Sequence, residues 1–148
     1  MKISDVIGQR VGKVVTIGSS ATVAELLELL DTHTIGCVVV SDDGKQVSGL
    51  VSERDVVGQL ARGSWSAQSP AERRVGDIMS NAVHTCGMGD DVEQLARYMT
   101  EHRVRHVPVI EDGEMVGIVS IGDIVKTRLD QLEYERDHLV KYVHGDRA

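Results

Sequence analysis

The sequence predicts an α/β fold in which two copies of a strand–helix–strand–strand–helix unit pack about a pseudo-twofold axis, followed by a long C-terminal helix. Three observations predict it: an internal repeat, the same order of helical and strand-like apolar spacing in both copies, and a core that must lack Phe. The 148 residues are 41% hydrophobic and 26% charged, which is typical of one globular domain or two half-size units. With one Trp, three Tyr and no Phe, the composition favours β-branched strands packed on Leu-rich helices.

The internal repeat covers most of the chain. A shift of 69 pairs residues 16–45 with 85–114, and a shift of 68 pairs 47–57 with 115–125. Of these 41 positions 14 are identical, and several of the identities are Gly, Ser, Asp or His. A single copy of about 45 residues is too small to bury its own apolar face. The duplication therefore predicts two copies that share a core.

Each copy has a helix followed by two strands. Thr22 and Glu25 have the spacing of a capping box, and Leu26 begins a helical pattern; Asp91 and Gln94 occupy the same offsets in the second copy. Short apolar runs at 37–40 and 106–110 predict strands, and 49–51 and 117–119 predict return strands. Between them we expect hairpin turns at Asp43-Gly44 and Asp112-Gly113.

The boundaries follow from these elements. We expect the first repeat at 1–60, a polar linker with Pro70 at 61–74, the second repeat at 75–128 and a helical extension at 129–148. One helix is predicted from 124 to 144, with Gly145 just after its end. An apolar seam follows it and either folds back on its own module or contacts a second subunit; it consists of Val125, Leu129, Leu132, Leu139 and Val143, with Arg136 interrupting.

Composition excludes several classes. The net charge of −7 argues against a nucleic-acid partner held by its phosphates, and no apolar run approaches the roughly 20 residues that cross a bilayer. The N-terminus lacks a secretory pattern, and Cys37 and Cys86 are too few for a disulfide framework and lack metal-ligand spacing. We expect a cytoplasmic protein with reduced thiols, no metal site, no required cofactor and no catalytic constellation.

The pattern Ser-x-x-Asp closes both copies. Ser52 and Asp55 follow one return strand, and Ser120 and Asp123 follow the other. One interpretation is a plain helix cap, with Ser at the N-cap and Asp near the positive end of the helix dipole. The other is a nucleotide cradle, in which the amides and hydroxyl bind a phosphate and the carboxylate accepts both hydroxyls of a ribose. The two interpretations are compatible.

The repeated unit, with GLVSERD and GIVSIGD closing its copies and EHRVRHVPV before the second, resembles the cystathionine β-synthase (CBS) domain pair, or Bateman module. The resemblance covers about residues 2–128. Within the family, the sequence is especially similar to small stand-alone bacterial CBS-pair proteins. It implies a non-catalytic regulatory module that binds AMP, ADP, ATP or NAD in clefts between the repeats. It also implies a homodimer and, further, an unidentified regulated protein.

The resemblance implies site residues position by position. Asp55 and Asp123 match the ribose-binding Asp. Hydroxyl or phosphate contacts are implied for Ser52, Ser120, Gly122, Arg54, Arg103, Arg105 and His106. Backbone contacts to adenine are implied for Thr16, Ile17, Gly36, Cys37, Val38, Thr85, Cys86, Val107 and Pro108.

The two copies differ where the basic residues lie, because Gly36-Cys37 stands in the first copy where Arg105-His106 stands in the second. We expect the better site at Asp123 with Arg103, Arg105 and His106, and a weaker one at Asp55 and Arg54, although the basic residues could serve either Asp. As neighbours in a strand, Arg105 and His106 are expected to face opposite ways. Two alternatives stay open: a dimerisation module with degenerate clefts, and an enzyme using the motif Asp.

Overall fold

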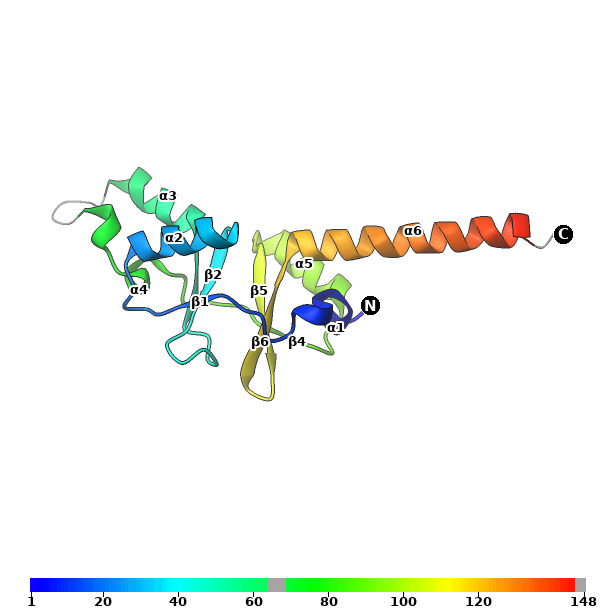
Figure 1. The fold of residues 1–148 in the computed structure, drawn as a ribbon, viewed down its shortest axis with the longest axis horizontal. Coiled ribbons are helices and arrows are strands. Elements are labelled where there is room, and N and C mark those ends of the chain that lie inside the picture. The colour runs from blue at the N-terminus through cyan, green and yellow to red at the C-terminus, as the bar shows by residue number, and fades with distance from the viewer. Residues whose placement is uncertain (64–68, 146–148) are drawn as a thin grey trace.

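The computed structural model describes residues 1–63 and 69–145, and two three-stranded sheets organise it (Figure 1). In the first sheet the central strand β2 pairs in parallel with β1 and antiparallel with β3. The first copy of the predicted unit is confirmed, with β1 at Thr16–Ile17, α2 at Val23–His33, β2 at Cys37–Val40, β3 at Gly49–Ser52 and α3 at Glu53–Arg62.

The second sheet repeats this topology, with β5 between β4 and β6. Its elements are β4 at Cys86–Gly87, α5 at Val92–His102, β5 at His106–Glu111, β6 at Glu114–Ser120 and α6 at Ile121–Gly145. Short helical segments precede each copy: α1 at Ile3–Ile7 and η1 at Gly8–Arg10, and η2 at Pro70–Glu72 and α4 at Val75–Ile78. Part of the predicted linker, 64–68 with Trp65, lies outside the described residues.

The two copies exchange their leading helices. Ile3 and Ile7 of α1 are buried in the core of the second sheet, with Val107 and Val119, whereas α4 packs in the core of the first. Backbone pairs fix the exchange, since Lys2 pairs with Asp91 and Arg74 with Thr22. Figure 1 shows α1 beside β4 and β6, far from the strand that follows it in the chain. Neither core is therefore complete without residues from the other copy.

A repeated glycine makes room for this exchange. A Cβ at Gly49 would lie 2.7 Å from the Ser80 carbonyl oxygen, in the segment after α4, and a Cβ at Gly117 would overlap the end of Ile7 in α1. Each glycine lies in the return strand of its own copy. The identity of these positions in the repeat thus has a packing cause: a side chain would push the exchanged segment off the sheet.

The turns between the paired strands differ in the two copies. Asp112 and Gly113 both have positive φ, 51° and 80°, and connect β5 directly to β6, as the hairpin dipeptide predicts. In the first copy the prediction of a tight hairpin is wrong: β2 ends at Val40 and β3 begins at Gly49. Asp43 stabilises this longer loop by accepting hydrogen bonds from the amides of Lys45 and Gln46, each 2.8 Å long.

The last helix projects away from both sheets (Figure 1). It begins at Ile121, three residues earlier than the apolar pattern predicts, and includes Gly145. Ile124 is 5% exposed in the core of the second sheet, while the predicted seam is exposed, from 48% at Leu132 to 62% at Leu139. The alternative in which this seam folds back on its own module is wrong.

Candidate functional site

Both Ser-x-x-Asp sequences form the same local structure. Ser52 N donates to Asp55 Oδ2 at 2.8 Å, and Asp55 N donates to Ser52 Oγ at 3.3 Å. The second pair repeats this with distances of 2.9 Å for Ser120 N to Asp123 Oδ2 and 3.0 Å for Asp123 N to Ser120 Oγ. The predicted helix caps are confirmed at both ends. In each pair, one carboxylate oxygen of the Asp accepts a hydrogen bond from the Ser amide at the start of the helix. This hydrogen bond fixes the orientation of the carboxylate, and with it the position of the second oxygen.

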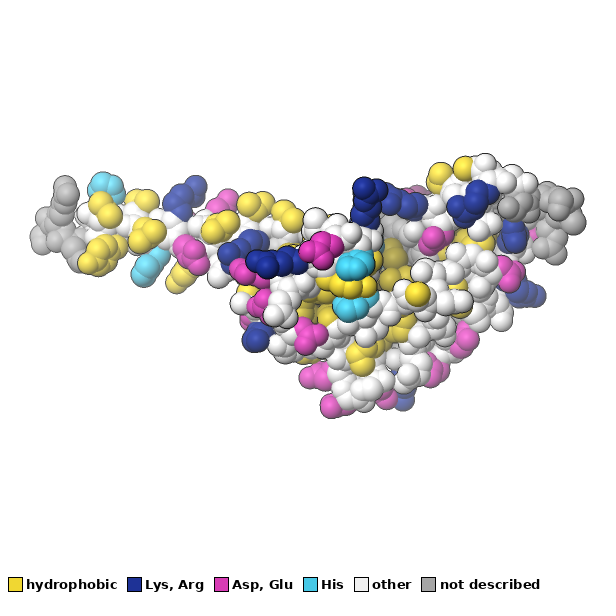
Figure 2. All heavy atoms as spheres, turned by 180° about the vertical axis from the view of Figure 1, so that it is seen from behind, with side chains coloured by type: hydrophobic (Ala, Val, Ile, Leu, Met, Phe, Trp, Pro, Cys, Tyr) yellow, Lys and Arg dark blue, Asp and Glu magenta, His cyan; other side chains and the backbone are white. Residues whose placement is uncertain are grey.

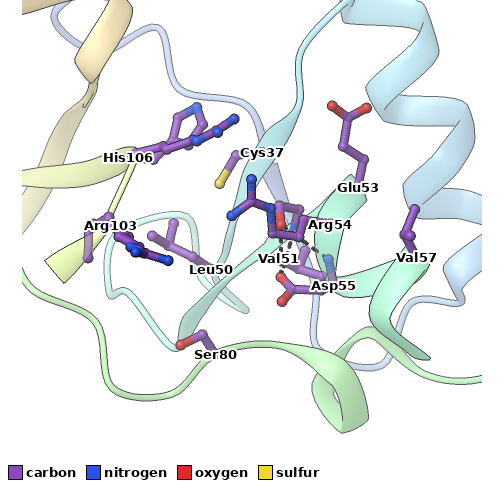
Figure 3. Close-up of a pocket in the computed structure, with 13 residues that line it drawn as sticks. Cys37, Leu50, Val51, Glu53, Arg54, Asp55, Val57, Ser80, Arg103 and His106 are labelled. Atoms are coloured by element: carbon purple, nitrogen blue, oxygen red, sulfur yellow. Dashed lines mark hydrogen bonds between the residues drawn. The ribbon is translucent and has the colours of Figure 1, made fainter. Parts of the chain in front are cut away.

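A cavity of about 570 Å³ opens beside the first of these junctions. This is within the usual range of small-molecule sites. Figure 3 shows Asp55 and Arg54 on one side of it, from the start of α3, and Arg103 and His106 on the other, from the segment that leads into β5. The cavity is lined by Cys37, Leu50, Val51, Ser52, Glu53, Arg54, Asp55, Val57, Ser80, Arg103, Val104, Arg105 and His106.

The polar groups of the cavity are largely unpaired. Within residues 1–63 and 69–145, the hydrogen bonds that reach the Asp55 carboxylate come from Ser52 and use Oδ2, so Oδ1 is available to a ligand. In the same described part of the chain, the guanidinium groups of Arg54, Arg103 and Arg105 form no salt bridge. An anionic group that entered this cavity would meet charged donors that no protein carboxylate already occupies.

The start of β5 explains how adjacent basic residues line one cavity. Arg103 ends α5 in the left-handed conformation, with φ 55°, and turns the chain toward the first copy. Because β5 begins only at His106, the alternation of a strand does not apply to Arg105. Both residues line the cavity, and the expectation that their side chains face opposite ways stays a prediction.

His106 is the titratable group of this wall. Burial lowers its pKa below the ordinary value, and nearby Arg105 adds to this, while the attraction of Asp123 works in the opposite direction. The imidazole therefore holds a proton less strongly than an ordinary histidine does. A phosphate placed beside it would favour the protonated form.

A backbone pair brings Ser80 into the cavity. Leu50 N donates to Ser80 O at 3.1 Å and Ser80 N donates to Leu50 O at 2.8 Å, which joins the segment after α4 to β3. Gly49 allows this approach. Sequence reasoning missed Ser80; its signal is the weak repeat of 3–7 at 75–79, whose next residue is Ser80.

The second junction has a different environment. Arg10 Nη1 lies 3.2 Å from Asp123 Oδ2 and donates a hydrogen bond to it. Partial burial would raise the pKa of the Asp123 carboxyl, but hydrogen bonds from Ser120 and then the Arg10 charge outweigh it and lower the pKa. Arg103, Arg105 and His106 line the cavity together with Asp55, and His106 also interacts electrostatically with Asp123. Which of the two aspartates these basic residues serve stays a prediction. Sequence reasoning also missed Arg10, which lies outside the aligned repeat.

The other predicted site residues are not among those that line this cavity. Of the residues predicted to contact adenine through their backbone, only Cys37 is in the lining. The second Ser-x-x-Asp motif, residues 120–123, is not in it. Thr16 and Ile17 form β1, Thr85 precedes β4, and Val107 and Pro108 lie within β5. The predicted residues outside the cavity are Ser120, Gly122, Asp123, Thr16, Ile17, Gly36, Val38, Thr85, Cys86, Val107 and Pro108.

Both cysteines are buried, as expected. Burial raises the pKa of the Cys37 thiol to about 12, with Asp55 adding to it, and raises that of Cys86 to about 11, with Asp90 adding to it. Both thiols are therefore protonated at neutral pH and poor nucleophiles. Among the described residues, no cluster of His, Cys, Asp and Glu could hold a metal ion, and no helix is long and apolar enough to span a membrane.

Comparison with known proteins identifies the repeat. The CBS domain family model matches residues 3–62 and 75–130. The CBS domain-containing protein CBSX3, mitochondrial, of Arabidopsis thaliana is 34% identical over 128 residues, which are 84% of this chain; the chain spans only 61% of that relative. YhcV of Bacillus subtilis, another CBS domain-containing protein, is 24% identical over 79% of this chain and 80% of its own length.

Solved structures have the same fold. The CBS-domain containing protein ATU1752 from Agrobacterium tumefaciens superimposes with a TM-score of 0.77 at 38% identity, covering 86% of this chain and 99% of that one. The CBS domain pair of MJ0100, solved in complex with 5′-methylthioadenosine and S-adenosyl-L-methionine, has a TM-score of 0.73 at 22% identity over 88% of this chain and 98% of its own. The chain thus belongs to the CBS domain family, as a pair of CBS repeats that exchange their leading helices.

Proposed function

We propose that this protein is a regulatory module that binds an adenine nucleotide in the cavity between Asp55 and the Arg103–His106 segment. AMP, ADP, ATP and NAD share the groups that this cavity suits, namely a ribose diol, an anionic phosphate and a flat base. The observation that supports it most is that one cavity of about 570 Å³ has an available carboxylate oxygen at one side and, at the other, guanidinium groups that form no salt bridge within the described part of the chain.

Each side of the cavity suits one part of the ligand. Asp55 Oδ1 can accept hydrogen bonds from both ribose hydroxyls, because its other oxygen is held by Ser52. Arg103, Arg105 and His106 are suited to the phosphates. The apolar lining of Cys37, Leu50, Val51 and Val104 is suited to the base. The adenosine compounds held by the MJ0100 pair agree with a ligand of this class.

We further propose that the ligand is bound without turnover, and that the occupied module reports energy or redox state to a protein partner in the cytoplasm. The buried, protonated thiols supply no nucleophile, and Asp55 already serves as a helix cap. The module is proposed to act as a homodimer.

Calorimetric titration with adenosine, AMP, ATP, NAD and S-adenosylmethionine tests this proposal. We expect saturable binding of at least one phosphate-bearing compound, with adenosine weaker, and unchanged ligand after prolonged incubation. A flat response to all five would instead favour a dimerisation module with degenerate clefts. Conversion of the ligand would favour an enzyme.

A further inference from the structure

Three stacked rings lie at the end of α5. Tyr98 is placed between His84, which precedes β4, and His102, the last residue of α5. The ring centroids are 3.8 Å apart from His84 to Tyr98 and 4.2 Å apart from Tyr98 to His102, with the ring planes tilted by 23° and 21°. Figure 2 shows two histidine side chains with a hydrophobic one between them on the face that it presents. We call these three residues the ring stack.

The ring stack is particular to the second copy. At the shift of 69 that relates the copies, His84 corresponds to Val15 and Tyr98 to Leu29. Val15 and Leu29 are partly buried against the core of the first sheet, so the fold itself needs only apolar side chains at these positions. The rings occur in the copy whose α5 leads into the cationic wall of the Asp55 cavity.

The residue that follows the ring stack is Arg103, which lines this cavity. Its φ of 55° lies in the left-handed region, which residues with a side chain rarely adopt. The Met99 carbonyl oxygen accepts hydrogen bonds from the Arg103 amide and, at 2.9 Å, from the Val104 amide. Such a backbone conformation persists where the surrounding structure fixes it. The neighbouring ring stack is in a position to do so.

Two interactions fix the last turn of α5. The His102 ring stacks on Tyr98, and His102 Nδ1 donates a hydrogen bond to the Tyr98 carbonyl oxygen at 3.0 Å. His84 then ties Tyr98 to the segment before β4. Helix ends fray when nothing restrains them, and fraying here would displace Arg103. In residues 1–63 and 69–145 the Arg103 guanidinium forms no salt bridge, so its place depends on this backbone turn.

We infer that Tyr98 is a positioning residue for the phosphate side of the cavity. Stacked between His84 and His102, it holds the turn at Arg103 and thereby keeps the Arg103 guanidinium at the cavity. This inference rests on the function proposed above and adds to it a residue that does not line the cavity.

A double-mutant cycle tests the inference. Tyr98→Leu introduces the residue that the first copy has at this position, so the fold should be kept. Its ATP affinity in calorimetry should fall about three- to tenfold, the size of one aromatic pair, while its adenosine affinity should equal that of the parent protein. Tyr98→Phe keeps the ring and should keep the ATP affinity. In an Arg103→Ala background, Tyr98→Leu should cause no further loss, because the two residues act as one unit.

Three results of this cycle would overturn the inference. One is an equal loss of ATP and adenosine affinity in Tyr98→Leu. Another is a loss in Tyr98→Phe as large as that in Tyr98→Leu. The third is a loss of ATP affinity from Tyr98→Leu that is the same with and without Arg103.

Backbone order parameters from ¹⁵N NMR relaxation, measured without nucleotide, separate this inference from the proposed function. At Arg103 and Val104 the order parameter should be about 0.85 in the parent protein and in Tyr98→Phe, and should fall toward about 0.6 in Tyr98→Leu. Thr34, at the corresponding turn of the first copy with φ 52°, is the internal control and should not change. An unchanged order parameter at Arg103 in Tyr98→Leu would overturn the inference. If the order parameters change as expected and no nucleotide binds, the proposed function fails and the positioning of Arg103 stands.

Discussion

At the junction of β3 and α3 the Asp55 carboxylate lines a cavity with Arg103, Arg105 and His106, whereas at the junction of β6 and α6 the Asp123 carboxylate is paired with Arg10. The two junctions have the same hydrogen bonds between Ser and Asp. They differ in what the rest of the molecule brings to them. We therefore expect ligand binding in this protein to depend on the opposite wall and not on the motif alone.

Aligning the two copies shows which residues make the two junctions differ. In each copy the Ser and Asp stabilise the start of a helix, and this role does not require a ligand. The segment at 103–106, on the opposite side of the cavity, does not have to cap a helix start in this way. In the alignment of the copies, Arg105 and His106 correspond to Gly36 and Cys37, which have no charged side chain. The second copy thus supplies cations at these two positions, whereas the corresponding residues of the first copy supply none.

The largest expected effect comes from replacing Asp55 with alanine. Asp55→Ala should weaken AMP binding by about 2–4 kcal/mol, because two charge-assisted hydrogen bonds to the ribose are lost. Asp123→Ala is the matched control, since each variant removes one capping carboxylate and should lower the free energy of unfolding by a similar amount of about 1 kcal/mol. Calorimetry and thermal unfolding measure the two quantities. Equal losses of affinity would remove the distinction between the junctions.

A smaller effect is expected for the cationic wall. Arg105→Ala should reduce ATP affinity by about 1.5–3 kcal/mol, the value of hydrogen bonds to a charged group, and should leave adenosine affinity nearly unchanged. Arg97→Ala, on the exposed surface of α5 outside the cavity, controls for the loss of one positive charge. If adenosine and ATP lose the same affinity in Arg105→Ala, the residue has no phosphate role.

The protonation of His106 should make binding depend modestly on pH. Burial lowers its pKa, and a bound phosphate should raise it, so binding should take up a proton. Affinity for AMP should then rise as pH falls through the bound-state pKa and level off below the free-state pKa. His106→Asn should remove this component while keeping the titration of the AMP phosphate itself, which both proteins share. Parallel pH profiles of the two proteins would contradict the assignment.

The smallest effect is expected at the second junction. Arg10→Ala should lower the free energy of unfolding by less than about 1 kcal/mol, because Arg10 is half exposed and surface ion pairs contribute little. The pKa of Asp123 should rise toward its ordinary value, since the Arg10 charge helps to lower it. NMR titration of the Asp123 carboxyl measures this shift. An unchanged pKa would mean that the ion pair is not formed in solution.

Local chemistry made much of the fold predictable from sequence. Thr22 with Glu25, and each Ser with its Asp, signal helix starts through hydrogen bonds that span three residues. The Asp112-Gly113 turn was likewise predictable, whereas the Asp43-Gly44 dipeptide lies in a loop of a length that no local signal fixes. Buried positions such as Val38 and Val107 follow from strand patterns.

The grouping of the site residues was not predictable in the same way. Arg103 and Asp55 are far apart in sequence, and their shared cavity depends on how the two sheets meet. Ser80 reaches β3 only because the copies exchange their leading helices, and Arg10 reaches Asp123 for the same reason. These are tertiary consequences of the exchange, which neither spacing nor propensity encodes.

A crystal structure of the protein with AMP tests the central claim most directly. The ribose hydroxyls should lie within hydrogen-bond distance of Asp55, about 2.6–3.0 Å, with the phosphate beside Arg103 and Arg105 and the Arg10–Asp123 pair intact. AMP bound at Asp123, with Arg10 displaced and the Asp55 cavity empty, would contradict the claim.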